Sequence, residues 1–146
     1  MSESLSEQLT DQQIRDALAN AKSIAVIGLS PDPSRASHHV AEYLIEHGYD
    51  ITGVRPGGHK PILERPVVES LSELNTAPDI VDVFRNSEAI PGVVDEIEKM
   101  IARGLKPKML WLQLGITNAE AEEKARRLGL QVVSNKCILI EHRNLL

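Results

Sequence analysis

Short, continuous apolar runs alternate along this chain with segments that repeat their apolar residues at helical spacing. This alternation restricts the fold more than any other feature. Because the runs lack a polar residue at every second position, they are typical of strands that are covered on both faces. Strands that are joined through helices pair in parallel through right-handed crossovers. The sequence therefore predicts an α/β fold, a doubly wound Rossmann-like parallel sheet of about five strands with helices on both faces.

Five apolar runs are the expected strands, and they lie at residues 23–27, 49–54, 79–84, 108–114 and 130–133. The expected helices lie at residues 10–21, 40–47, 90–101 and 117–128. Caps are expected from Thr10 with Gln13 at the first helix, from Ser87 before the third and from Thr117 at the fourth. In the proline-rich loop 55–70 we expect at most a short strand at 67–68, and at 137–140 a short apolar segment.

The length and composition predict the general class of protein. A chain of 146 residues fits one domain, residues 1–146, of which the polar residues 1–9 are expected to be flexible. No apolar run approaches the ~18–20 residues of a membrane span, and the start is too polar for a signal peptide. Acidic residues (21) outnumber basic ones (16), which argues against nucleic acid as a partner. With a single cysteine as well, we expect a cytoplasmic protein that binds a small molecule.

The loop after the first run has the features of an anion site. Gly28 allows close approach of the backbone, Ser30 and Ser37 offer hydroxyl groups, and the following helix presents free N–H groups. Arg35 adds a cation to the same loop. A dinucleotide site would have further glycines here and a carboxylate after the second strand. Because the second run ends instead at Arg55, ordinary NAD binding is disfavoured.

Arg55 indicates a second phosphate. A cation at the end of the second Rossmann strand typically binds a phosphate on the adenosine. Arg35 and Arg55 together predict a ligand with two separate phosphate groups. Both NADP and coenzyme A meet that requirement, so the residues alone leave both open.

Several motifs in order along the chain resemble one family. They are G-x-S-x-x-P-x-R-x-S at 28–37, V-x-P at 54–56, DIVDVFR at 79–85, LWLQLGI at 110–116, and Cys137 followed by Glu141 and His142. Over about residues 22–143 the chain is similar to the stand-alone CoA-binding-domain family. Members of that family resemble the CoA-binding domain of succinyl-CoA synthetase and of NDP-forming acyl-CoA synthetases. The resemblance implies CoA or an acyl-CoA as the cofactor, bound without catalysis by the domain itself.

The resemblance also implies where the ligand lies. The 3′-phosphoadenosine diphosphate would cover the first loop and the end of the second strand. Phosphate contacts are expected from Gly28, Ser30 and Arg35, adenosine contacts from Val54, Arg55 and Pro56, and a neighbouring wall from Phe84 and Arg85. The other expected cofactor-binding residues are Leu29, Ser37, Gly115 and Cys137.

The chain departs from the family at two places near this expected site. The family commonly has Pro-Val-Asn-Pro where this chain has Gly-Val-Arg-Pro at 53–56. It commonly has Asp-Arg-Cys where this chain has Asn-Lys-Cys at 135–137. The first change adds a cation at the adenosine end, and the second removes an Asp–Arg pair beside the cysteine.

Catalysis and metal binding are weaker interpretations. Cys137 with His142 is the one thiol–imidazole combination, and a lone cysteine is more often a buried apolar residue. His38 with Glu42 has helical ligand spacing, but no further ligand cluster accompanies the pair. Asp82 interrupts an apolar run, and we expect backbone N–H groups to bond to it. The alternative functions are an NADP-type oxidoreductase and a CoA-dependent enzyme that acts with an unknown partner subunit.

Overall fold

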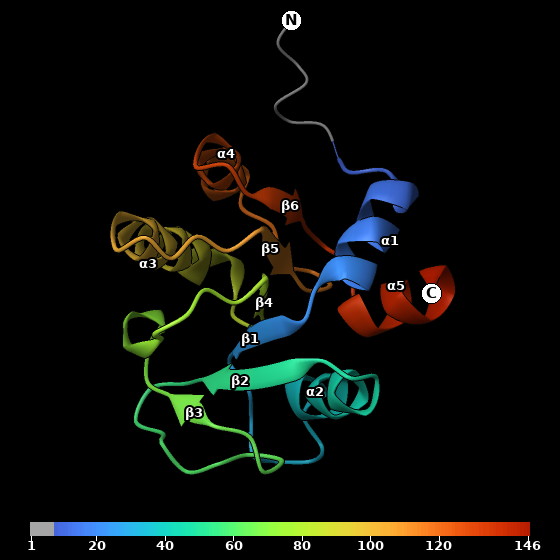
Figure 1. Ribbon diagram of the computed structural model, residues 1–146, viewed down its shortest axis with the longest axis vertical. Coiled ribbons are helices and arrows are strands. Elements are labelled where there is room, and N and C mark those ends of the chain that lie inside the picture. The colour runs from blue at the N-terminus through green and yellow to red at the C-terminus, as the bar shows by residue number, and fades with distance from the viewer. Residues whose placement is uncertain (1–7) are drawn as a thin grey trace, which may run out of the picture.

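The computed structural model describes residues 8–146, and its centre is a sheet of six parallel strands (Figure 1). The strand order is β3-β2-β1-β4-β5-β6. The bounds are β1 Ser23–Ile27, β2 Asp50–Val54, β3 Val67–Val68, β4 Ile80–Val83, β5 Met109–Leu112 and β6 Gln131–Val133. The doubly wound parallel sheet is therefore confirmed. The sixth strand is the two-residue β3, which pairs with Gly53 and Val54 of β2 at the sheet edge.

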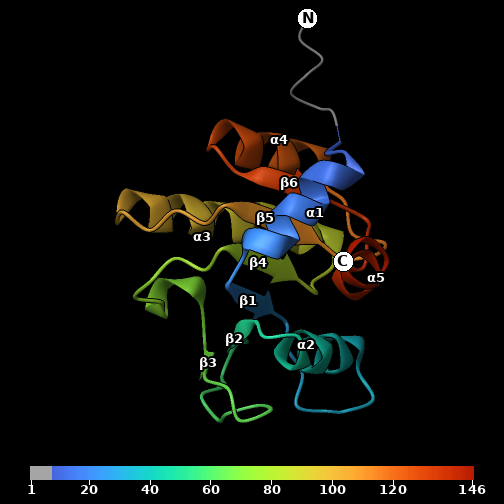
Figure 2. The same cartoon turned by 45° about the vertical axis from the view of Figure 1, so that its right-hand side comes forward.

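Within residues 8–146, five α-helices cover the two faces of the sheet (Figures 1 and 2). Helices α1 (Asp11–Asn20), α2 (Ala36–Glu46) and α5 (Ile138–Leu145) lie on one face. Helices α3 (Ile90–Ala102) and α4 (Ala119–Arg127) lie on the other face. Successive residues of each strand point to opposite faces, so that Ile24 and Val26 pack under the first group and Ala25 and Ile27 under the second. This two-sided burial is the reason for the continuous apolar runs.

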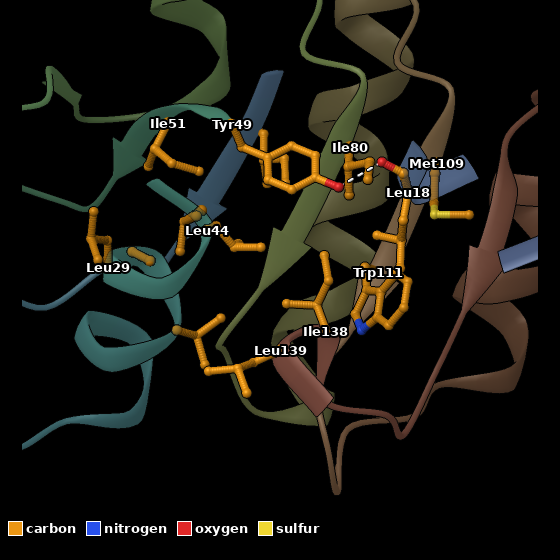
Figure 3. Close-up of a cluster of buried hydrophobic side chains, with 14 of the residues drawn as sticks. Leu18, Leu29, Leu44, Tyr49, Ile51, Ile80, Met109, Trp111, Ile138 and Leu139 are labelled. Atoms are coloured by element: carbon orange, nitrogen blue, oxygen red, sulfur yellow. Dashed lines mark hydrogen bonds between the residues drawn. The ribbon is translucent and has the colours of Figure 1, made fainter. Parts of the chain in front are cut away.

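Residues from distant parts of the chain pack together between the sheet and helices α1, α2 and α5 (Figure 3). Trp111 of β5 and Ile138 of α5 are fully buried in this layer. Tyr49, which precedes β2, donates a hydrogen bond of 2.6 Å to the carbonyl of Leu18 in α1. Leu9 is partly buried against the same core, whereas the expected flexibility of residues 1–7 lies outside the described residues.

The helix ends differ from the expected ones in small ways. The capping box of Thr10 at α1 is confirmed. Asn86 caps the turn before α3 and Asn118 caps α4, in place of Ser87 and Thr117. The physical reason is that each asparagine accepts the N–H three residues ahead at 3.1 Å, while the Thr117 N–H donates to the Ser87 hydroxyl. The expected apolar terminus is the first turn of α5.

The two aspartates of the DIVDVFR run have different surroundings. Asp79 accepts backbone hydrogen bonds from Lys22 at 2.7 Å and Ser23 at 3.3 Å. Asp82 lies in the interior of β4 and is fully buried, and neither of its carboxylate oxygens has a hydrogen-bond partner within residues 8–146. The expectation that backbone N–H groups would bond to Asp82 is wrong, because strand pairing already uses the nearby N–H groups.

Candidate functional site

The sharp turn after β1 requires glycine at position 28. Gly28 has φ 89°, in the left-handed region, and its N–H donates to the Val54 carbonyl at 2.8 Å. A Cβ atom at this position would lie 2.7 Å from the Phe84 carbonyl oxygen, which leaves no room for a side chain. Because Gly28 lies where β1 meets both β2 and β4, the turn brings the loops after these three strands together. This is the switch point of the sheet.

Hydrogen bonds between its own residues hold the loop 29–37 in place. The Ser37 hydroxyl accepts the Ser30 N–H at 3.0 Å, and the Ser30 hydroxyl accepts the Asp32 N–H at 3.0 Å. His38 is bonded through Nδ1 to the Ser30 carbonyl at 2.9 Å. Each serine hydroxyl keeps its own O–H for a further acceptor. Both serines thus organise the loop, a role that their sequence positions did not reveal.

Asp32 is the loop residue that the sequence reasoning missed. Its Oδ1 accepts hydrogen bonds of 2.9 Å from both the backbone N–H and the hydroxyl of Ser34. These bonds lower the pKa of Asp32 below its ordinary value, with a smaller contribution from the nearby Arg35. The loop therefore carries one negative charge beside its cation. The D-x-S spacing is a common turn pattern and could have predicted it.

Arginines from two different loops line one cavity next to Gly28. This loop cavity of about 320 Å³ is lined by Gly28, Leu29, Ser30, Asp32, Arg35, Arg55 and Pro56. Arg35 is exposed immediately before α2, and Arg55 is partly buried directly after β2. Neither guanidinium makes a hydrogen bond or an ion pair with any residue from 8 to 146. Among the described residues the cavity thus has two unpaired cations and one acid, of which only Oδ1 is bonded to Ser34.

Two further cavities adjoin the loop cavity. The outer cavity, of about 370 Å³, shares Arg55 and Pro56 with it and continues along the loop 57–62. The apolar cavity has about 450 Å³, and Ala36, the residue after Arg35, is one of its lining residues. Its lining residues are Ala36, Val40, Phe84, Arg85, Asn86, Gln113, Leu114, Ile116, Cys137 and Ile140. The ends of β2, β1, β4 and β5 therefore form one continuous edge with a cationic part and an apolar part.

Comparison with known proteins assigns the family. The family model described as CoA binding domain matches residues 22–143. This chain belongs to the CoA-binding-domain family. A curated relative, the uncharacterized protein YneT of Bacillus subtilis, is 36% identical over 130 residues, which are 89% of this chain and 92% of the relative.

Solved structures agree with the fold of this CoA-binding-domain protein. The cell-free ID.343 structure from Thermus thermophilus is 36% identical with a TM-score of 0.87, and the match covers 94% of this chain and all of that one. A dinucleotide-forming acetyl-coenzyme A synthetase 1 of Ca. Korarchaeum cryptofilum matches 82% of this chain with 27% of its own length, at a TM-score of 0.66. Its identity of 22% shows a shared fold alone.

Not every binding residue expected from the sequence presents its side chain at the carboxyl ends of the strands in this CoA-binding domain. The side chains of Leu29 and Val54 are buried in opposite layers of the core, which leaves their backbone for any ligand contact. Gly115 has φ 84°, and its N–H donates to the Asn135 side chain at 2.7 Å. Asn135 itself has φ 59°, a conformation that asparagine tolerates. The Asn-Lys departure from the family thus shapes the loop that leads to Cys137.

Cys137 and His142 line two different cavities. Cys137 is partly buried in the apolar cavity. His142 is hydrogen-bonded through Nδ1 to the Tyr43 hydroxyl at 2.8 Å, beside a cavity at the amino ends of β1 and β2. Burial, and then the neighbouring His47, lower the pKa of His142 below 6.5. The structure therefore forms no Cys–His pair from these residues.

Within residues 8–146, no three His, Cys, Asp or Glu side chains are grouped so as to hold a metal ion. The spacing of His38 and Glu42 is therefore not supported by a third ligand there. No helix of the same part of the chain has the length and apolar character needed to cross a membrane.

Proposed function

We propose that this protein binds coenzyme A or an acyl-CoA along the carboxyl edge of its sheet, without catalysing a reaction on its own. The diphosphate would lie over the loop after β1 with Arg35, and the adenosine 3′-phosphate would lie at Arg55. The pantetheine arm would cross the start of α2 into the apolar cavity. The observation that carries this proposal is the convergence of Arg35 and Arg55, both unpaired within residues 8–146, on the loop cavity.

The second cavity supports a ligand that is charged at one end and less polar at the other. Ala36, which lines the apolar cavity, directly follows Arg35, so a ligand anchored by Arg35 would pass the first turn of α2 to enter this cavity. The membership in the CoA-binding-domain family supports the same ligand. An NADP-type oxidoreductase that uses a tyrosine as its acid–base group is not supported, because both tyrosines point elsewhere: Tyr43 bonds to His142 and Tyr49 to Leu18.

Calorimetry tests the ligand and the role of Arg35 together. CoA is expected to bind the natural protein more tightly than NADP or NAD. The Arg35→Ala change should weaken CoA by about 10–150-fold, because a charge-assisted hydrogen bond contributes about 1.5–3 kcal/mol. Asp32→Asn is the matched control, since the amide oxygen can still accept from Ser34 while the negative charge is removed. This control should bind CoA at least as tightly as the natural chain.

NADP binding tighter than CoA would favour the oxidoreductase interpretation. Equal CoA affinity of the natural chain and Arg35→Ala, with both chains folded, would remove the assigned role of the loop after β1.

Cys137 is expected to form a mixed disulfide with the ligand. Its thiolate would attack one sulfur of CoA disulfide, form a protein–CoA disulfide and release the other half as the CoA thiolate. The placement of Cys137 in the apolar cavity, where the pantetheine arm is proposed to end, supports this reaction. Intact mass measurement after treatment with CoA disulfide should show one CoA adduct, which Cys137→Ser abolishes. An adduct that forms only after unfolding would make Cys137 a packing residue.

A further inference from the structure

Exposed apolar side chains concentrate at one end of the proposed site. In the described residues 8–146, three large apolar side chains are exposed: Leu114 at 68%, Ile140 at 39% and Leu146 at 49%. Leu114, after β5, and Ile140, in the first turn of α5, both line the apolar cavity. Exposed apolar surface at the rim of a cavity typically marks a binding site for an apolar group.

The floor of the same cavity offers one directed polar group. Gln113 is only 5% exposed, and its Oε1 accepts the Ile138 N–H at 3.2 Å. Because an N–H can only donate, this bond fixes the side-chain oxygen toward Ile138. The amide NH₂ of Gln113 makes no hydrogen bond within residues 8–146, although the side chain lines the cavity. A carbonyl oxygen is the ligand group that would satisfy this donor.

Free CoA leaves much of this arrangement unused. At its terminus free CoA has only a thiol, which is a poor hydrogen-bond acceptor, because the two amide carbonyls of the pantetheine arm lie further from that end. A thioester adds a carbonyl oxygen directly beside the sulfur and an attached carbon chain that would cover Leu114 and Ile140. An unbranched apolar chain that starts beside Cys137 would bury the rim of the cavity.

We infer that the apolar cavity binds the acyl group of an acyl-CoA with an apolar chain of several carbons, and that Gln113 donates a hydrogen bond to the thioester carbonyl. This inference rests on the proposed function, because the phosphates of the same ligand lie in the loop cavity. It narrows the ligand from CoA in general to apolar acyl thioesters.

A titration series of CoA, acetyl-, butyryl-, hexanoyl- and octanoyl-CoA tests whether the apolar cavity binds the acyl chain of the ligand. Affinity for the natural protein should rise about two- to fourfold for each added methylene until the cavity is filled. Leu114→Ser and Ile140→Ser should flatten this rise, so that octanoyl-CoA loses a larger factor in affinity than CoA itself. Leu146→Ser is the matched control: this residue is similarly exposed but lines the cavity at the opposite edge, and its change should not alter the series.

An S-alkyl-CoA tests the hydrogen bond from Gln113, because its carbon chain is as long as that of the matching acyl-CoA but it lacks the thioester carbonyl. It should bind about two- to twelvefold more weakly than the matching acyl-CoA, as expected for the loss of one hydrogen bond. This comparison uses the natural protein, so it does not depend on whether a Gln113 variant folds. In a folded Gln113→Leu variant the difference between the two ligands should vanish.

The outcomes separate this inference from the proposed function. Tight CoA binding with no gain from longer chains would overturn the inference and leave CoA binding intact. No binding of any member of the series would overturn both. A chain-length dependence that persists in the two rim variants would place the acyl group elsewhere. A dimer of the natural chain that Leu114→Ser dissociates would assign the exposed patch to self-association.

Discussion

An Asp82→Val variant is expected to be more stable than the natural chain at every pH, with a difference that grows as the pH rises. The fully buried Asp82 carboxyl lacks a hydrogen-bond partner in the described part of the chain. Such a group costs about 1–3 kcal/mol relative to an apolar side chain, even when it is neutral. In the register of the sheet its neighbours are Val26 and Trp111, so valine would join an apolar row.

Ionisation explains the dependence on pH. Burial raises the pKa of Asp82 well above 3.8, so between the unfolded and the native pKa the carboxyl is protonated in the folded chain and ionised in the unfolded one. The natural chain therefore loses stability as the pH rises from about the unfolded pKa to the native one. The loss is a factor of about ten in the unfolding equilibrium constant for each pH unit in that interval. Valine does not titrate, so the variant avoids this loss.

Denaturant unfolding at several pH values measures both effects. His142, whose lowered pKa makes the fold less stable as the pH drops below 6.5, acts in the opposite direction. It is present in both chains, and its effect cancels in their difference. Asp79→Val is the matched control, because it removes the acceptor of the Lys22 and Ser23 N–H groups. That variant should be less stable by about 1.5–3 kcal/mol.

A lower stability of Asp82→Val across the whole pH range would contradict the account. It would mean that the Asp82 carboxyl gains a hydrogen-bond partner in solution. An unchanged pH dependence in the variant would instead show that Asp82 is not the group responsible.

The fold could be predicted from the sequence because each long strand is buried on both faces. β1 shows this directly: Ala25 and Ile27 meet α3 and α4, while Ile24 and Val26 meet the other layer. Helix α5 could not be predicted in the same way. Its later residues are mostly polar, and the partner that makes His142 a packing residue, Tyr43, is far away in the sequence.

Of the candidate site, only the cationic part could be predicted from the sequence, because each arginine stands out within its own loop. Arg35 and Arg55 stand out because cations follow two neighbouring parallel strands, and the structure places both at one cavity. Gln113 and Ile140 gave no such signal. Their importance depends on a contact between the end of β5 and the first turn of α5, which no local pattern encodes.

Loss of discrimination between CoA and dephospho-CoA is the expected result of Arg55→Ala. The two ligands differ only in the 3′-phosphate, and Arg55 follows β2, where the adenosine end of the ligand is proposed to lie. The natural protein should bind CoA about 10–150-fold more tightly than dephospho-CoA, which is the contribution of one charge-assisted hydrogen bond of about 1.5–3 kcal/mol. In Arg55→Ala the two affinities should be nearly equal, because only CoA loses affinity.

The comparison with Arg35 makes this prediction specific to one phosphate. Arg35→Ala should weaken both ligands by the same factor, since the diphosphate is common to them. The aliphatic part of Arg55 packs against Gly58, so thermal unfolding must show that Arg55→Ala stays folded. Arg55→Lys keeps the charge without the planar fork and should retain part of the discrimination. If Arg55→Ala weakens both ligands equally, Arg55 binds the diphosphate, and the 3′-phosphate lies elsewhere along the sheet edge.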